Sequence, residues 1–566
     1  MRLPHRNIIL AASPGALAFA LYWRTMARHG DMGNGLMLTV AADELGVPSR
    51  TGHPLYVLAA HAFLRWLPVG EPILRTTIFS AVSAALAVAV VGIAAYRLTK
   101  RWWAGAFAGA LFGVSDALWS HAVVAEVCAL HALLSACTLS GVLGWIQTGS
   151  RRSLYVATLC FGLSIANAPI ALTWAPMMLA ALMVGRPKRA AASANAGSRG
   201  AALIAVGLLP LLLYLLVPVF AARDPLINFA AAGPSWLDRP VVTWHTRWRA
   251  AVDYFGIPEE HVREGYLLLQ YGLAVIWLAP VGLWRLARRR REVLAVTVLA
   301  YLGPVACAIG TGAGNAGPLY IASHMVVALW LAVGARAVVF AASRLLRRAL
   351  RERAGRKRLR ALLILGMLGL PAFVMAGNYR AIARSGSQPM TALGRAMLDR
   401  TDRNAVIIVS GTDWAYPAFY VQRLERRRPD VVLLLDAYFR WPNLRLIERE
   451  RRRGLVIRAP GCRHKGKDLR SAEHAWCCMH QLIWDNHSRR KVYVAGPLAG
   501  LIMRNDPIRD RLPPCRRLAP GLPMIEFEFP GGGASPPAIP EPPAMRLAMP
   551  SEPAAHHHEH HHEDAH

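Results

Sequence analysis

The chain has 566 residues, of which 54% are hydrophobic, and its mean hydropathy is +0.29. A chain this apolar and this long is not an ordinary soluble protein, and its composition indicates a polytopic membrane protein. The formal net charge of +31 does not indicate a nucleic-acid partner, because much of the basic excess lies in short clusters between apolar segments, and no zinc finger or basic helix with interleaved aromatics is present.

Apolar segments of about the length that a bilayer requires of a helix recur along the first two thirds of the chain. The eleven candidates are 7–23, 75–97, 103–119, 127–146, 154–168, 169–184, 201–222, 265–284, 293–311, 319–342 and 361–377. The fifth and sixth share one apolar run, which is interrupted at Ala166-Asn167-Ala168-Pro169. We expect the first segment to be retained as a span rather than cleaved, since no small-residue cleavage site follows it.

Basic clusters between these segments predict an orientation. With eleven spans, the N-terminus and all the strongly basic loops fall on one side, which the positive-inside rule makes cytoplasmic. These loops hold Lys100-Arg101, Arg151-Arg152, Arg186-Pro187-Lys188-Arg189, Arg288 to Arg291, and Arg344 to Arg360. The loop around Asp31, the loop 223–264 and the C-terminal region are then outside. We therefore expect a multi-pass protein of a bacterial inner membrane whose C-terminal domain is periplasmic.

After Gly377 the sequence reads as a small soluble domain. Buried strands are predicted at 404–410, 430–435, 490–495 and 524–529, with a helix at 414–427. This order favours an α/β domain with parallel strand pairing. From Pro530 the chain is rich in Pro, Gly and Ala and ends in HHHEHHHEDAH, which predicts disorder.

The predicted fold class is thus a mainly α-helical polytopic membrane protein with about eleven transmembrane helices and a small C-terminal α/β domain. The predicted domains are a transmembrane domain at 1–378, a periplasmic domain at 379–530 and a disordered tail at 531–566.

The eight cysteines divide into two sets of four. Cys128, Cys137, Cys160 and Cys307 lie in apolar spans and are interpreted as small buried hydrophobic residues. Cys462, Cys477, Cys478 and Cys515 lie in the C-terminal region, where an oxidising compartment favours disulfides. A zinc site that combined these with His464, His474 and His480 would match no standard spacing, so we expect no metal centre.

The loop between the first two spans carries the first functional candidate. Asp31 stands between glycines just beyond a span, where a carboxylate is costly unless it has water or a partner. Gly52-His53-Pro54-Leu55-Tyr56 predicts a turn that is followed by an amphipathic helix over Pro54 to Leu67. A solvated loop acid is the alternative interpretation of Asp31.

Several motifs in this order resemble the bacterial protein O-mannosyltransferase-like family of GT-C type membrane glycosyltransferases. The opening signature is carried by Leu21-Tyr22, Gly30-Asp31-Met32-Gly33, Leu45-Gly46-Val47 and Thr51 to Tyr56, and the second by Trp119 to Val127. Gly162 to Asn167, Tyr214 to Pro218, Tyr416 to Gln422 and Arg428 to Val431 resemble later parts. The resemblance covers most of residues 8–450.

The resemblance implies transfer of a hexose, with mannose as the first choice, from a polyprenyl-phosphate donor to a Ser or Thr hydroxyl of an exported protein. Its partners would be the lipid-linked donor, membrane lipid and the acceptor protein, with no further cofactor. Asp31 would be the general base, because inversion requires one base and no covalent intermediate, and Glu126 would assist.

Substrate-binding candidates come from the residue types that such a donor requires. Cationic groups stabilise a phosphate leaving group, which makes Arg24, Arg28 and Arg223 candidates. His53, Tyr56 and Asn167 belong to the matching motifs, and Trp244 and His245 lie in the large outer loop, where aromatic rings can stack on a sugar. Interfacial packing is the alternative for the aromatic residues, as a helix-cap role is for Glu126.

The sequence departs from the family pattern in the opening motif. Asn34 stands where the family has Glu, and an ungapped alignment places Asn34 at the position of the acid itself. Ser49-Arg50-Thr51-Gly52 replaces a His-Pro-Pro-Gly corner, and Asn167-Ala168 replaces Asn-His. Alternatives that remain open are the same fold acting on a lipid or envelope glycan, and a catalytically silent scaffold whose periplasmic domain binds a partner. A transporter is disfavoured, because the spans show no inverted repeat and few intramembrane charges.

Overall fold

The computed structural model divides the chain into two compact units. Unit 1 holds Met1–Arg28, Thr51–Val219 and Trp236–Ser387, and unit 2 holds His29–Arg50, Phe220–Ser235 and Gln388–His566. The residues that the structure describes are 4–31, 33–49, 51–184, 196–223, 225–229, 271–311, 317–349, 353–386, 390–435, 454–457, 472–486, 489–504, 512, 514–519 and 522–527. The predicted tail at 531–566 lies outside them.

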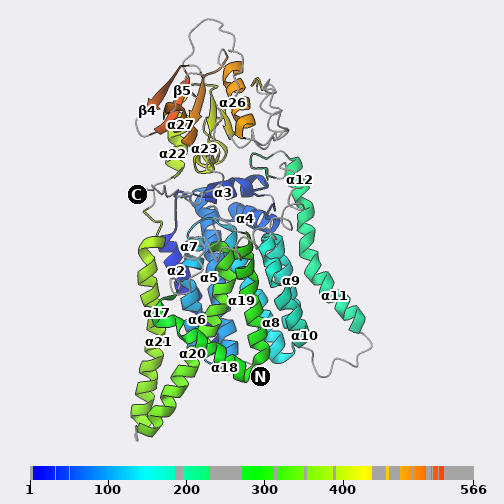
Figure 1. The fold of residues 1–566 in the computed structure, drawn as a ribbon, viewed down its shortest axis with the longest axis vertical. Helices are drawn as coiled ribbons and strands as arrows, with labels where there is room; N and C mark the ends of the chain where they lie inside the picture. Colours follow the sequence, from blue (N-terminus) through cyan, green and yellow to red (C-terminus); the bar gives the residue numbers. More distant parts are fainter. Residues whose placement is uncertain are drawn as a thin grey trace, which may run out of the picture. The chain divides into compact units, whose positions relative to one another are not determined.

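In the described part of unit 1 the regular secondary structure is all helical (Figure 1). In chain order its elements are α1 (His5–Ala12), α2 (Pro14–Thr25), α4 (Pro54–Trp66), α5 (Pro72–Thr99), α6 (Trp102–Gly113), α7 (Asp116–Ala122), α8 (Val127–Thr148), α9 (Arg151–Asn167), η1 (Pro169–Trp174), α10 (Ala175–Val184), α11 (Ala196–Leu208), η3 (Leu209–Leu215), α12 (Leu216–Ala222, which ends in unit 2), α17 (Leu273–Ile276), α18 (Leu278–Arg289), α19 (Arg291–Thr311), α20 (Gly317–Ala349) and α21 (Arg353–Ile382).

Seven helical segments in the described part of the chain are long and apolar enough to cross a membrane. They are His5–Thr25, Pro72–Thr99, Val127–Thr148, Gly200–Ala222, Arg291–Ala308, Tyr320–Leu345 and Lys357–Ile382, with Pro169–Val184 as a shorter apolar helical segment. The chain is therefore a multi-pass membrane protein, although the predicted count of eleven spans is not confirmed. The predicted span 103–119 is divided between α6 and α7, and part of 265–284 lies outside the described residues.

The core of unit 1 is formed where α5, α6, α8 and α20 pack against one another (Figure 1). Small residues bring the backbones together: a Cβ added to Gly92 of α5 would lie 2.1 Å from the carbonyl oxygen of Ala11. Phe107, Trp119 and Tyr22 fill the core with fully buried rings, and the hydroxyl of Tyr22 donates to the carbonyl oxygen of Gly113 at 2.7 Å. Because membrane helices gain little from excluding water, such close backbone contact stabilises the bundle.

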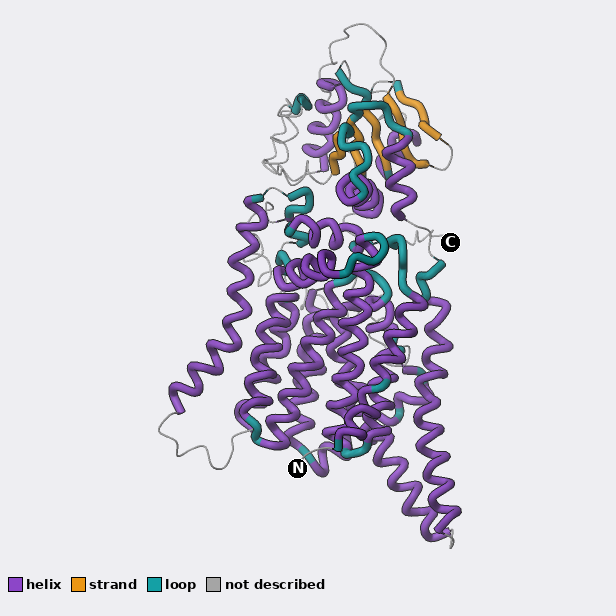
Figure 2. The backbone as a smooth tube through the Cα atoms, turned by 180° about the vertical axis from the view of Figure 1, so that it is seen from behind, coloured by secondary structure: helices purple, strands orange, loops and turns teal. Residues whose placement is uncertain are grey.

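Unit 2 contains all the strands that the structure describes, which are orange in Figure 2. Its elements are α3 (Gly35–Glu44), α22 (Met390–Asp399), β1 (Val406–Val409), α23 (Thr412–Leu424), β2 (Val432–Leu435), α26 (Ala472–Asn486), β3 (Val492–Ala495), α27 (Pro497–Arg504), β4 (Cys515–Ala519) and β5 (Leu522–Phe527). All four predicted strands and the predicted helix are present. We did not predict α3, α22, α26, α27 or β4.

The sheet of unit 2 has the strand order β2-β1-β3-β5-β4. β1 pairs in parallel with β2 and β3, with Ile408 opposite Leu434 and Val494, whereas β5 pairs antiparallel with β3 and β4. Every residue of β1, β2 and β3 is buried, which explains their uninterrupted apolar sequences. The predicted parallel pairing is confirmed for these three strands, and the complete sheet is mixed.

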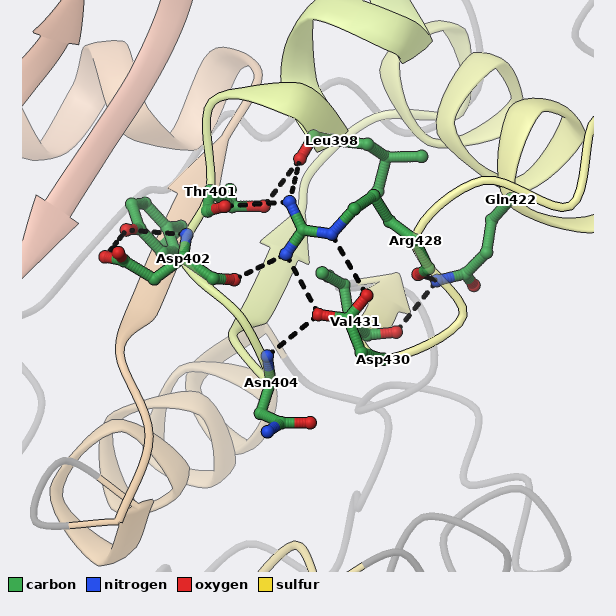
Figure 3. A network of polar contacts seen from close by, with 9 residues as sticks. Leu398, Thr401, Asp402, Asn404, Gln422, Arg428, Asp430 and Val431 are labelled. Atoms are coloured by element: carbon green, nitrogen blue, oxygen red, sulfur yellow. Dashed lines mark hydrogen bonds and ion pairs between the residues drawn. The ribbon is translucent and has the colours of Figure 1, made fainter.

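Arg428 connects the elements at the start of this sheet (Figure 3). Its guanidinium donates to the carbonyl oxygens of Leu398 and Thr401, both at 2.8 Å, and to both carboxylate oxygens of Asp430, each at 3.0 Å. The backbone amide of Asn404 also donates to Asp430, at 2.9 Å. The motif Arg428 to Val431 thus holds the end of α22 and the starts of β1 and β2 together.

The segment 29–50 of the opening loop is part of unit 2. Val47 forms a parallel bridge with Asn228, in which the Val47 amide donates to the Ile227 carbonyl at 2.8 Å and the Phe229 amide to the Val47 carbonyl at 2.9 Å. The hydroxyl of Thr391 donates to the His29 carbonyl at 3.3 Å. The domain limits 378 and 530 stay predictions.

Candidate active site

A corner in the chain orients the first site residues of unit 1. Gly52 and His53 have positive φ angles of 76° and 45°, and α4 begins directly after them at Pro54, whose fixed φ suits a first helical position. This confirms the predicted turn and helix. The corner places Tyr56 in the first turn of α4, where its side chain is fully buried and its ring meets Phe79 edge-on at 5.9 Å.

His53 contacts the end of α9. Its Nδ1 lies 2.6 Å from the carbonyl oxygen of Asn167. Since a carbonyl oxygen only accepts, Nδ1 carries the proton, and Nε2 of the neutral ring is then an acceptor. Burial lowers the pKa of His53, with the Asn167 contact acting in the opposite direction, so the neutral form is favoured.

Asn167 connects this corner to the start of α8. Its side-chain amide donates to the carbonyl oxygen of Val127 at 3.3 Å, while its side-chain oxygen is buried and has no hydrogen-bond partner in the part of the chain that the structure describes. The hydroxyl of Tyr56 is likewise buried and makes no hydrogen bond to any described residue. Two buried polar atoms of unit 1 are therefore available to a ligand, which is unusual because such atoms are normally paired.

Glu126 is the N-cap residue of α8, and Ser80 of α5 fixes its backbone. The Glu126 amide donates to the Ser80 hydroxyl oxygen at 3.0 Å, and that hydroxyl lies 3.3 Å from the Glu126 carbonyl oxygen. Burial raises the pKa of Glu126 to about 7, against the opposite effect of the Val127 amide. Burial, and secondly the negative charge of Glu126, raise the pKa of Tyr56. The Tyr56 hydroxyl therefore stays neutral and can donate a hydrogen bond.

His121, at the end of α7, completes this part of unit 1. Its ring lies close to Glu126 and Cys128, and burial lowers its pKa to about 4, so it is neutral near pH 7. The indole of Trp119 on the same helix donates to the Thr25 hydroxyl oxygen at 3.0 Å. We refer to His53, Tyr56, His121, Glu126, Cys128 and Asn167 as the α8 cluster.

Four of the predicted site residues therefore belong to one cluster, namely Glu126, His53, Tyr56 and Asn167. The sequence analysis missed His121 and Cys128 as site residues, having interpreted Cys128 as a buried hydrophobic residue. The signal was the spacing His121-x₄-Glu126-x-Cys128 at the start of an apolar span.

The other predicted site residues are placed elsewhere. Arg24 and Arg28 belong to unit 1 and are exposed. Asp31 is partly buried and Arg223 is exposed, and both belong to unit 2. Trp244 and His245 lie outside the described residues.

Comparison with solved structures identifies the class of fold. ArnT from Cupriavidus metallidurans in the apo state matches with a TM-score of 0.51 and 13% identity, over 90% of this chain and 96% of ArnT. The same protein bound to undecaprenyl phosphate matches with a TM-score of 0.50 and 12% identity, over 92% of this chain and 97% of ArnT. At these identities the likeness shows the fold alone. The predicted fold class, a GT-C-like helical membrane protein with a small C-terminal α/β region, is confirmed.

The family resemblance is also confirmed, for part of the chain. Residues 38–191 match the family model for the Protein O-mannosyl-transferase TMEM260 N-terminal domain. Protein O-mannosyl-transferase TMEM260 of Mus musculus is 29% identical over 132 residues, which are 23% of this chain and 19% of the mouse protein. The chain thus matches about a fifth of that relative's length.

Proposed function

We propose that this protein transfers a hexose, with mannose as the first choice, from a polyprenyl-phosphate donor to a Ser or Thr hydroxyl of an exported protein. The observation that carries the proposal is the match of residues 38–191 to an O-mannosyltransferase domain, because the whole α8 cluster lies within that stretch. The fold shared with ArnT, which has been solved with undecaprenyl phosphate, supports a lipid-linked donor.

The proposed reaction is a single displacement with inversion. The acceptor hydroxyl oxygen attacks the anomeric carbon, the bond from that carbon to the phosphate oxygen breaks, and the lipid phosphate leaves with the bonding electrons. The hydroxyl proton passes to a carboxylate, and we assign this role of general base to Asp31, on the resemblance of its motif.

The α8 cluster would hold the sugar or the acceptor hydroxyl. In its ionised form, Glu126 accepts a hydrogen bond from a substrate hydroxyl, while Tyr56 donates one and Nε2 of His53 accepts one. The buried oxygen of Asn167 offers a further acceptor. A carbohydrate presents both donors and acceptors, which this mixture of groups would satisfy.

The lipid phosphate requires cationic partners. Arg24, Arg28 and Arg223 are exposed guanidinium groups and are the proposed phosphate ligands, because arginine binds phosphate through two parallel hydrogen bonds. Trp244 and His245 keep their predicted role of stacking on the sugar or acceptor.

The direct test is transfer by the purified full-length protein from synthetic polyprenyl-phosphate mannose to a Ser/Thr peptide. We expect mannosyl peptide from the wild type, its loss in Asp31→Asn, and at least about 10-fold slower transfer in Glu126→Gln, which loses a charged hydrogen-bond acceptor for the substrate. Asp43→Asn is the matched control for the loop acid, and Asp116→Asn is the control for Glu126. Transfer only to a lipid or glycan acceptor would replace the protein-acceptor proposal, and no transfer to any acceptor would favour the scaffold.

The proposed setting is a bacterial inner membrane with a cytoplasmic N-terminus and a periplasmic C-terminal domain. The basic residues Arg151 and Arg152, at the start of α9, carry this orientation through the positive-inside rule. With the native cysteines replaced by serine, an impermeant thiol reagent applied to intact spheroplasts should label Arg403→Cys and leave Ser150→Cys unlabelled. The opposite pattern would reverse the orientation.

A further inference from the structure

Three side chains of the α8 cluster have a geometry that the sugar-transfer proposal does not explain, although it uses one of them, Glu126, to bind a substrate hydroxyl. An imidazole nitrogen of His121, a carboxylate oxygen of Glu126 and the Sγ of Cys128 all lie within 4.8 Å of one another. Cys128 Sγ is 4.0 Å from Glu126 Oε2. All three side chains are partly buried.

This set of donors has a defined metal preference. A thiolate together with an imidazole and a carboxylate favours Zn²⁺ or Co²⁺, whereas Mg²⁺ and Ca²⁺ require oxygen ligands. Zinc bonds of about 2.0–2.3 Å in a tetrahedral arrangement separate the ligand atoms by roughly 3.5 Å. The Cys128–Glu126 separation of 4.0 Å is close to this value, and the other two separations are at most 4.8 Å, so binding an ion would require the side chains to close in on it.

We propose that His121, Glu126 and Cys128 bind a divalent ion of the Zn²⁺ class, with three protein ligands and one open coordination position. The sequence analysis predicted no metal centre there, because this spacing matches no standard zinc motif and the ligands come from the end of α7, the N-cap of α8 and its first turn. An open fourth position is the arrangement of zinc sites that also bind water or a substrate.

The surroundings of these ligands support a built site. Ser80 fixes the backbone at Glu126 through two hydrogen bonds, and the hydrogen bond from Trp119 to Thr25 fixes α7. The backbone segments that carry the ligands are therefore held in place. The buried hydroxyl of Tyr56, which has no hydrogen-bond partner in the described part of the chain, belongs to the same cluster. It would donate to a water or anion in the open position. A thiol that merely donates to the Glu126 carboxylate is the alternative.

The test is spectroscopic and uses the full-length protein in detergent with Co²⁺ as the probe. A thiolate bound to Co²⁺ produces a ligand-to-metal charge-transfer band in the near ultraviolet, and a tetrahedral site gives intense visible bands. The His-rich end of the chain will also bind Co²⁺, but the last eleven residues contain no cysteine and cannot produce the thiolate band. Cys137→Ser, on the same helix and outside the α8 cluster, is the matched control for Cys128→Ser.

We expect the thiolate band in the wild type and in Cys137→Ser, and its loss in Cys128→Ser. In the wild type the band should also disappear when Zn²⁺ displaces Co²⁺. His121→Gln should weaken Co²⁺ binding by at least about 10-fold. Absence of the band from the wild type, or full retention in Cys128→Ser, would overturn the proposal. If Cys128→Ser unfolds, the affinity of His121→Gln for Co²⁺ tests the proposal instead, because this variant keeps the thiol. The readout does not depend on sugar transfer, so this site stands or fails separately from the proposed function.

Discussion

Glu44, the last residue of α3, forms an ion pair with Arg423 of α23, within unit 2. The Glu44 side chain is only 6% exposed, and its carboxylate also accepts a hydrogen bond from the Leu226 amide at 2.8 Å. The opening-loop segment that carries Asp31 is therefore tied to a helix of the C-terminal region. The placement of the proposed base depends on residues far away in the sequence.

Removal of Arg423 should loosen α3. Arg423→Gln leaves a buried carboxylate without its cation and should cost about 1–2 kcal/mol locally, less than for a fully buried pair because Arg423 is 59% exposed. Faster hydrogen exchange over residues 35–44, with slower sugar transfer, is the expected result. Arg426→Gln, two residues beyond the end of α23 and exposed, is the matched control. Unchanged exchange in Arg423→Gln would contradict the anchoring role.

The substitution Tyr56→Phe tests whether the Tyr56 hydroxyl binds substrate or stabilises the fold. Since this hydroxyl is buried without a hydrogen bond to a described residue, Tyr56→Phe should leave stability unchanged or raise it by up to about 1 kcal/mol. Transfer activity should nevertheless fall by about 10-fold, from the loss of one substrate hydrogen bond. Thermal unfolding and initial rates measured on the same preparation check both expectations. A large loss of stability would show that the hydroxyl serves the fold instead.

Asp430 gives unit 2 a dependence on pH. Its hydrogen bonds with Arg428 lower the pKa of Asp430 from 3.8 to about 2 (Figure 3). A carboxyl whose folded-state pKa is lowered adds stability that is complete above the unfolded pKa, so this contribution is lost as pH falls from about 4 to about 2. The protection of the β1 and β2 amides, measured against the intrinsic exchange rate at each pH, should therefore fall across that interval.

Asp430→Asn should remove that pH dependence, with a stability loss of about 1–2 kcal/mol at neutral pH. Asp413→Asn, in the first turn of α23, serves as the comparison. An identical acid response in Asp430→Asn and wild type would exclude Asp430 as its source.

Gly92 tests the packing of unit 1. Its missing Cβ would approach the Ala11 carbonyl oxygen to 2.1 Å, so Gly92→Ala forces α1 and α5 apart and should cost about 1–3 kcal/mol. A lower thermal midpoint in detergent is the expected observation. Gly366 of α21 has open space at its Cβ position, and Gly366→Ala should be neutral or stabilising by about 0.5–1 kcal/mol. Equal effects of the two substitutions would argue against the close contact.

The elements that could be predicted are those whose signal is local. Uninterrupted apolar sequence predicted α5, α8 and the central strands β1 and β3, and the Gly52-His53-Pro54 corner predicted the start of α4. Strand β4 was missed because Cys515-Arg516-Arg517 is too polar to resemble a buried strand, and its place is secured by pairing with β5. The attachment of α3 to α23 had no local signal, since Glu44 and Arg423 meet only through the tertiary fold.

Only those residues of the candidate site that belong to local sequence motifs could be predicted. Glu126, His53 and Asn167 were selected from motifs, and the structure unites them through the His53–Asn167 contact and the Asn167–Val127 hydrogen bond. Cys128 resembled an ordinary span residue, and only the turn between α7 and α8 brings it close to His121.

Intact-glycoprotein mass spectrometry of exported proteins tests the central claim most directly. It compares cells that carry the wild-type gene, a deletion, Asp31→Asn or Glu126→Gln, each at matched expression. We predict that hexose on Ser and Thr is present in the wild type, is absent from the deletion and Asp31→Asn, and is strongly reduced in Glu126→Gln. Loss in the deletion alone would leave the transferase and refute the assigned residues. Unchanged glycoproteins in the deletion would contradict protein glycosylation itself.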